Sequence, residues 1–116
     1  MSIQFLPDHF SGRSDAIAQL DASGLHWIDG DIKPADLSGP PHAHPYDVAI
    51  YLLGGVFELT DCDAGITHRL EAGCKAVVPA GTLHAEFSPE GFTAVFGLTI
   101  DPAPLMAERS RSLPAD

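Results

Sequence analysis

The chain has 116 residues, 45% of them hydrophobic and 19% charged, a composition that excludes intrinsic disorder and fits one folded domain over residues 1–116. Six Lys and Arg stand against sixteen Asp and Glu, a net charge of −10, which disfavours nucleic-acid partners and anionic membrane surfaces. The longest mostly apolar run, residues 48–57, is too short to cross a bilayer, and no export signal opens the chain. We therefore expect a cytoplasmic protein with no membrane or nucleic-acid partner.

The first third of the chain predicts one helix and one short strand. Ser14 is a candidate N-cap for a helix that ends before Gly24. Residues 25–28 form a candidate strand, which the Asp-Gly pair ending at Gly30 would close with a turn. Residues 33–41 contain three prolines and a glycine, so we expect a loop there.

From residue 46 onward, short runs rich in β-branched and aromatic residues alternate with turns that contain Gly or Pro. The predicted strands cover residues 46–53, 56–60, 66–70, 75–78, 83–87 and 92–100. Short strands that follow one another at about 8–12 residues are typical of an all-β sandwich or barrel. After the last strand, residues 105–112 either form a short terminal helix or fray.

Two histidines, His42 and His44, precede the first long strand. Such a pair arises by chance roughly 0.3 times in a chain of this composition, so it is weak evidence by itself. Residues two apart in a strand project to the same face, where two imidazoles can bind one metal ion.

A second motif is more specific, because it combines Gly73, Pro79, Gly81 and His84 at fixed offsets. The Pro-x-Gly-x-x-His part alone is expected by chance roughly 0.05 times. Together with the histidine pair, this motif resembles the two sequence motifs of the cupin family, and the resemblance covers about residues 39–96.

The resemblance implies both a fold and a metal site. The fold is all-β, a double-stranded β-helix (a jelly-roll barrel) with a core over about residues 25–100 and short irregular or helical termini. In cupins the histidines of both motifs bind one divalent transition metal. This nominates His42, His44 and His84 as ligands of one Fe, Mn, Ni, Zn or Cu ion.

The acidic member of the site departs from the family pattern. Many cupins place a Glu ligand four residues after the second histidine, where this chain has Val48. Asp47 lies one residue earlier and faces the site only if a bulge turns it inward. Glu86 shares strand parity with His84, so we expect it to be the fourth ligand or the general acid–base. Ser88 replaces an Asn that is usual in the family.

The family resemblance leaves three classes of function open. The first is a metal-dependent enzyme that acts on a small organic molecule, of dioxygenase, isomerase or lyase type. The second is a non-catalytic module that binds a small molecule or a metal, such as a sensor. The third is a degenerate barrel without metal. One scaffold supports many chemistries, so the fold does not choose between them.

The predicted strand at residues 46–53 is apolar on both faces, so both faces should be covered. We expect the inner face to line the barrel and a second subunit to cover the outer face, which predicts a homodimer. Aromatic residues such as Tyr46 are expected to form core or cavity wall.

The remaining candidates for chemistry lack a supporting motif. Cys62 and Cys74 are twelve residues apart and are expected to be reduced thiols. We treat His9, His26 and His68 as ordinary polar positions.

Overall fold

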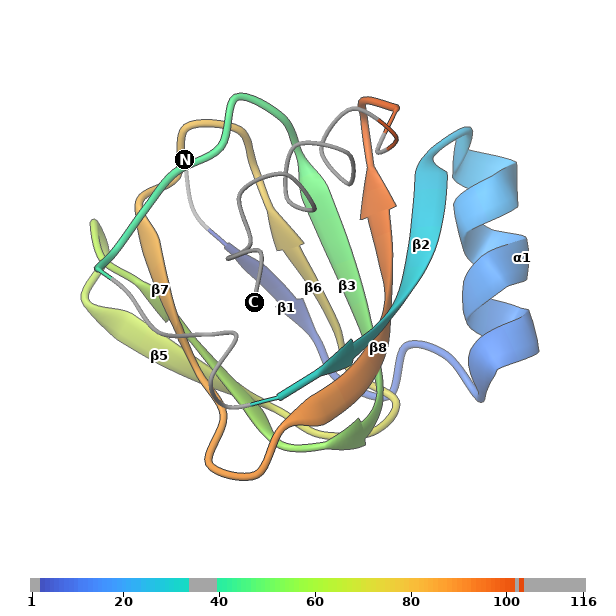
Figure 1. The fold of residues 1–116 in the computed structure, drawn as a ribbon, viewed down its shortest axis with the longest axis horizontal. Coiled ribbons are helices and arrows are strands. Elements are labelled where there is room, and N and C mark those ends of the chain that lie inside the picture. The colour runs from blue at the N-terminus through green and yellow to red at the C-terminus, as the bar shows by residue number, and fades with distance from the viewer. Residues whose placement is uncertain (1–2, 34–39, 102, 104–116) are drawn as a thin grey trace, which may run out of the picture.

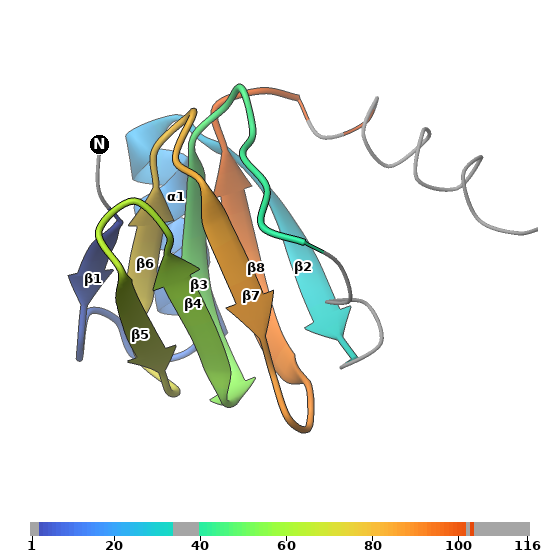
Figure 2. The same ribbon diagram turned by 90° about the vertical axis from the view of Figure 1, so that its left-hand side faces the viewer.

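A computed structural model describes residues 3–33, 40–101 and 103. In chain order its elements are β1 (Gln4–Leu6), α1 (Arg13–Ser23), β2 (His26–Ile32), β3 (Val48–Gly55), β4 (Phe57–Asp61), β5 (Ile66–Leu70), β6 (Lys75–Val78), β7 (His84–Phe87) and β8 (Phe92–Leu98). The strands pair antiparallel in a sheet of order β1-β6-β3-β8-β2 and a second sheet of order β5-β4-β7 (Figure 1). Figure 2 shows the smaller sheet in front of the larger one, with α1 behind both. The all-β jelly-roll fold is confirmed.

Most strands lie where the sequence predicts them. β5 and β6 have the predicted bounds, and β4, β7 and β8 differ by one or two residues at their ends. The turns that separate them contain glycines with positive φ, such as Gly65 (φ 69°) and Gly91 (φ 93°). Only glycine adopts this conformation without strain, which is why glycine marked these turns correctly.

β2 is longer than predicted, because Asp29 and Gly30 do not form a turn. Both lie inside β2, which pairs with β8 along its whole length. A Cβ at Gly30 would lie 2.3 Å from Cε2 of Phe96, so this glycine is needed for close packing. β3 likewise begins and ends two residues later than predicted, and its register against β8 shifts between Leu52 and Gly54.

The N-terminal segment adds β1, which was not predicted, and α1. The helix follows Gly12, so the prediction that Ser14 caps it is wrong. The carboxylate of Asp15 instead accepts a hydrogen bond of 2.8 Å from the N–H of Ser11. The helix ends as predicted at Gly24, which has a left-handed φ of 72° and donates its N–H to carbonyls of the last turn.

Two predicted segments cannot be compared with the structure in full. Residues 34–39 of the expected loop and the expected terminal helix at 105–112 lie outside the described residues. Within the described part of the chain, no helix is long and apolar enough to span a membrane.

The core forms two layers, one on each face of the five-stranded sheet. The first layer lies between the two sheets and includes Ile50 of β3 and Phe57 of β4. The second lies between the larger sheet and α1 and includes Tyr51 of β3 and Leu20 of α1. β3 is therefore apolar on both faces because each face packs against a different layer.

The outer face of β3 is covered by the protein's own N-terminal segment, which corrects the expectation that a second subunit covers it. The ring of Tyr51 is fully buried and contacts that of Phe10 edge-on, with ring centroids 5.2 Å apart. Ala16 and Leu20 of α1 complete this layer, and both are fully buried. The argument that led to a homodimer no longer applies to this face, and the homodimer stays a prediction.

Candidate metal centre

Main-chain hydrogen bonds join the two sequence motifs. His42 and His84 form an antiparallel bridge in which the N–H of each donates to the carbonyl of the other at 2.9 Å. The N–H of Gly81 donates to the carbonyl of His44 at 2.8 Å. The segment that carries His42 and His44 is thus tied to the beginning of β7, although the two are about forty residues apart in the sequence.

Asp47 strengthens this junction and does not reach the histidines. Its Oδ1 accepts a hydrogen bond of 2.8 Å from the N–H of Ala80, in the turn before His84. Its own N–H donates to Oγ1 of Thr99 at 3.1 Å. Asp47 is not among the residues that converge with the histidines.

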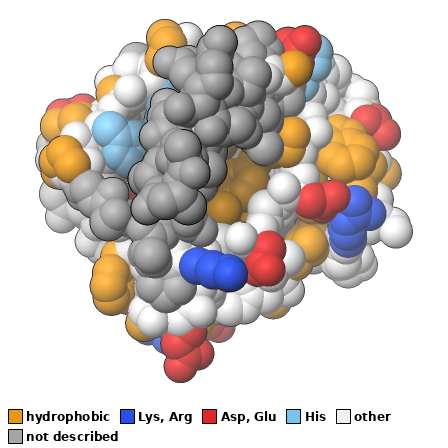
Figure 3. Space-filling view, in the orientation of Figure 1, with side chains coloured by type: hydrophobic (Ala, Val, Ile, Leu, Met, Phe, Trp, Pro, Cys, Tyr) orange, Lys and Arg blue, Asp and Glu red, His pale blue; other side chains and the backbone are white. Residues whose placement is uncertain are grey.

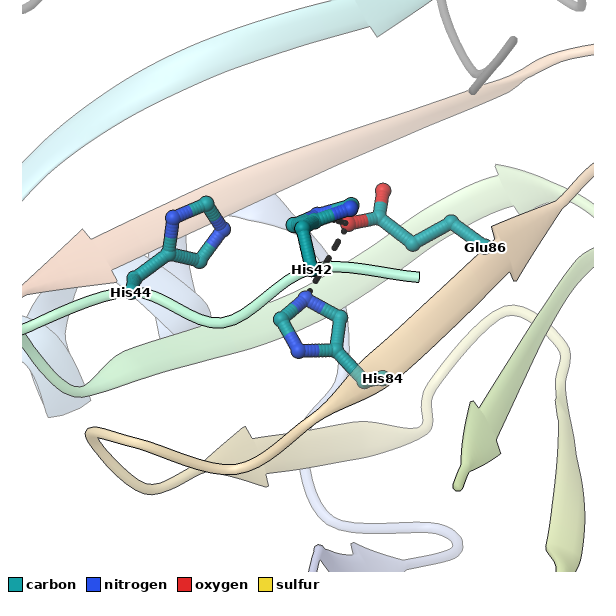
Figure 4. Close-up of side chains that lie close together, drawn as sticks. All are labelled: His42, His44, His84 and Glu86. Atoms are coloured by element: carbon teal, nitrogen blue, oxygen red, sulfur yellow. Dashed lines mark hydrogen bonds and ion pairs between the residues drawn. The ribbon is translucent and has the colours of Figure 1, made fainter. Parts of the chain in front are cut away.

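Three histidines and one glutamate converge in a single cluster. His42, His44, His84 and Glu86 each offer a ligating atom, and these four atoms all lie within 4.8 Å of one another (Figure 4). His84 is 2% exposed and forms the buried side of the cluster, whereas His42 is exposed. Figure 3 shows histidine side chains at the surface of this face of the molecule. The cluster can therefore be reached from solvent.

Hydrogen bonds on the far side of the rings fix how the histidines face the cluster. Nδ1 of His84 is 2.9 Å from the carbonyl oxygen of Thr82, and Nδ1 of His42 is 3.3 Å from that of Pro40. A carbonyl only accepts, so both rings carry their hydrogen on Nδ1. Nε2 of each ring then points to Glu86, which is the arrangement of metal-binding histidines with an outer hydrogen-bond partner.

Glu86 pairs with two of the imidazoles. Its Oε1 lies 3.0 Å from Nε2 of His42 and 3.3 Å from Nε2 of His84. The hydrogen bond to Glu86 raises the pKa of His84, against the opposing effect of burial. Burial alone would raise the pKa of Glu86, but hydrogen bonds and charge from His84 and His42 together hold it below its ordinary value. Burial, followed by the neighbouring histidines, lowers the pKa of His44.

Tyr46 is the site neighbour that sequence reasoning missed. Its ring stacks on His44 with centroids 4.9 Å apart and planes 21° apart, and its hydroxyl oxygen lies 3.3 Å from Nδ1 of His44. Burial and the charge of Glu86 raise the pKa of Tyr46. Strand parity with His44, two residues earlier, is the signal that could have found it, although the chain bends at Pro45 and Tyr46.

The candidates without a motif lie outside the cluster. The ring of His68 stacks on Phe5 with centroids 5.5 Å apart, and His9 and His26 are exposed. Cys62 and Cys74 are not paired with each other, as expected.

Comparisons with known proteins agree with this fold. Residues 30–100, more than half of the chain, match the sequence model of the family described as "Cupin domain". A DUF861 family protein from Thermotoga maritima is 15% identical over 84% of this chain and 99% of its own, with a TM-score of 0.56. An RmlC-like cupin from Shewanella frigidimarina is 25% identical over 64% of each chain, with a TM-score of 0.50. A search of curated proteins found no match. The chain belongs to the cupin family.

Proposed function

We propose that this cupin binds one divalent transition metal through His42, His44 and His84, with Glu86 as fourth ligand or general acid–base, and that it is a metal-dependent enzyme acting on a small organic molecule. The observation that carries the proposal is the convergence of the four ligating atoms within 4.8 Å of one another.

The donor geometry fits a metal ion. Two donors bound to one ion at about 2.1 Å lie about 3.0–3.4 Å apart when adjacent and at most about 4.2 Å apart. The distances from Oε1 of Glu86 to the two Nε2 atoms, 3.0 and 3.3 Å, are already those of adjacent ligands. Small side-chain adjustments would bring all four donors to a common centre.

The donor chemistry limits the choice of metal. Three neutral imidazoles and one carboxylate suit Fe, Mn, Ni, Zn or Cu, and they do not form the all-oxygen site preferred by Ca²⁺ or Mg²⁺. When bound, the ion would supply Lewis-acid chemistry to an oxygen-bearing ligand. Whether the reaction is an oxygenation, an isomerisation or an elimination depends on the metal and on the pocket wall.

The chain's own residues provide two further elements of an active site. Glu86 lies beside His84 and can hold or accept a proton there. An organic ligand that reached the apolar layer between the sheets would be shielded from water there. A small-molecule ligand at the barrel mouth would therefore contact the ion on one side and apolar side chains on the other.

One observation favours the alternative, a barrel that binds without catalysis or holds no metal. In the structure Glu86 already satisfies the Nε2 atoms of His42 and His84, so these polar groups need no ion. A sensor or a degenerate cupin would retain this network.

The test is the metal content of the purified protein, compared with the double variant His42→Ala/His44→Ala. Variants His26→Ala and His68→Ala are matched controls, because both residues lie outside the cluster. We expect about one equivalent of a transition metal in the wild type and in both controls, and none in the double variant. Absence of metal from the wild type, even after incubation with iron, manganese, nickel, copper and zinc salts, would contradict the proposal.

A further inference from the structure

We propose that Tyr46 is a positioning residue of the metal site: its hydroxyl and ring hold His44 in the tautomer and orientation that present Nε2 to the ion. This inference rests on the proposed metal site and adds a residue that the cupin motifs do not contain.

Two separate contacts join Tyr46 to His44. The stacked rings, with centroids 4.9 Å apart and planes 21° apart, fix the plane of the imidazole. The contact of 3.3 Å between the hydroxyl oxygen and Nδ1 fixes its rotation within that plane. Figure 4 shows the result: the ring nitrogen of His44 that is farther from its backbone points toward His42, and the other points away from the cluster.

His44 differs from the other two histidines in the kind of partner that its Nδ1 meets. The partners of His42 and His84 are main-chain carbonyls, which only accept and so fix the tautomer by themselves. A hydroxyl can donate or accept, so the tautomer of His44 depends on Tyr46. Among these three outer partners, Tyr46 is the side chain that a substitution can remove.

Metal binding decides the direction of this hydrogen bond. An ion bound to Nε2 of His44 uses the lone pair of that nitrogen, so the ring must carry its hydrogen on Nδ1. The hydroxyl oxygen of Tyr46 then accepts that hydrogen, which completes an outer shell in which each of the three Nδ1–H groups has an oxygen partner. Without the oxygen, Nδ1–H of His44 loses its acceptor and the ring loses a restraint.

The experiment compares Tyr46→Phe with Tyr51→Phe, which removes the hydroxyl of the chain's other tyrosine. Tyr51 lies in the layer under α1, and its hydroxyl has no hydrogen-bond partner there. Cobalt(II) binding is followed by absorption in the full chain. The Nδ1–H signals of the histidines are followed by NMR in the zinc(II)-loaded proteins, and thermal unfolding is measured without metal.

We expect the cobalt(II) affinity of Tyr46→Phe to fall by about 10- to 100-fold, the range seen when an outer hydrogen-bond partner of a ligand is removed. The Nδ1–H signal of His44 should shift or broaden, those of His42 and His84 should not, and Tyr51→Phe should match the wild type in both measurements. Equal affinity and an unchanged His44 signal in Tyr46→Phe would overturn the inference and leave the metal site intact. A fall that merely follows a lower unfolding temperature would also overturn it. If the wild type binds no cobalt(II), the proposed function itself fails and the role of Tyr46 with it.

Discussion

Glu86 links the histidine cluster through a single oxygen atom. Oε1 lies 3.0 Å from Nε2 of His42 and 3.3 Å from Nε2 of His84, and an Nε2–H that donates to this oxygen stabilises the cluster when no ion is bound. The same nitrogens would turn their lone pairs to a metal. The network therefore keeps these donors assembled without an ion, which would lower the cost of ordering them around a metal.

We predict that Glu86→Gln lowers metal affinity by more than about tenfold, because loss of a ligand should cost at least as much as loss of a ligand's outer partner. Glutamine keeps the size of the side chain and removes its negative charge. The measurement is a cobalt(II) titration of Glu86→Gln beside Glu90→Gln, an exposed acidic residue in the next turn. An affinity equal to that of the wild type, together with lost turnover, would assign Glu86 to proton transfer and not to ligation.

A second carboxylate, Asp61, is buried at the end of β4 and serves stability. Oδ1 accepts a hydrogen bond from the N–H of Ala64 at 3.1 Å, and Oδ2 accepts one from the N–H of Ile3 at 3.2 Å. These main-chain donors, Ala64 first, lower the pKa of Asp61. A carboxyl group with a lowered folded-state pKa stabilises the fold above its ordinary pKa of about 3.9, and this contribution is lost as the pH falls through the folded-state value.

Asp61→Asn should therefore destabilise the protein at neutral pH, and the difference from the wild type should shrink as the pH falls below about 4. Asparagine has one acceptor oxygen for two donors, so one N–H loses its partner. Urea unfolding across this pH range checks the prediction, with Asp63→Asn as a control in the exposed part of the same turn. A difference that does not change with pH would contradict it.

At the level of single residues, the sequence predicts those members of the cluster that a motif or the alternation of a strand identifies. His42, His44 and His84 follow from the two motifs, and Glu86 follows from its parity with His84. Tyr46 also had the right parity, but a tyrosine beside an apolar strand is more often part of the core or a cavity wall, so the sequence did not indicate its contact with His44. Its stacking on His44 depends on a ring orientation that periodicity does not contain.

Two glycines inside the strands differ in how closely neighbouring residues pack against them. Gly97 of β8 faces α1, and a Cβ there would lie 2.3 Å from Cδ2 of Leu20. A Cβ added at Gly54 of β3 would have no atom within 4 Å. The two glycines therefore differ in their packing although both lie in the five-stranded sheet.

We predict that Gly97→Ala lowers the free energy of unfolding by about 1–3 kcal/mol, because the added methyl group overpacks the layer under α1. Gly54→Ala should be neutral or stabilising by up to about 1 kcal/mol, since it restricts the unfolded chain and meets no neighbour. Chemical denaturation of both variants measures the difference. Equal free energies of unfolding for the two variants would show that α1 shifts to accommodate the methyl group and is not tightly packed on β8.

At the level of elements, prediction succeeds where neighbouring residues determine the structure of a segment. It fails where a contact with a distant segment determines it. β5 and β6 were found because short β-prone runs lie between turns that need glycine. Gly30 was read as part of a turn, but the ring of Phe96, more than sixty residues away, requires a glycine inside β2. β1 has three residues, too few for a periodic pattern, and exists because β6 offers it an edge.

For the whole molecule, the N-terminal helix explains how the outer face of β3 is covered, which the sequence predicted without indicating the covering element. The sequence predicts a helix before Gly24, and the apolar outer face of β3 predicts that this strand is covered, yet neither prediction says that the two meet. The structure joins them in a layer that includes Leu20 and Tyr51. The cluster has His84 and Glu86 on β7 of the smaller sheet, whereas α1 covers the far face of the larger sheet. A change under α1 can therefore be tested without altering the cluster.

The central claim is that the two motifs hold one metal ion, and the most direct test is anomalous X-ray diffraction from crystals of the cobalt(II)-loaded protein. The account predicts one strong anomalous peak about 2.1 Å from Nε2 of His42, His44 and His84, with an oxygen of Glu86 at a similar distance. Crystals of Tyr51→Phe, whose substitution lies in the core layer between the larger sheet and α1, should show the same peak. Data with no peak between these side chains, or with cobalt only at surface carboxylates, would contradict the account.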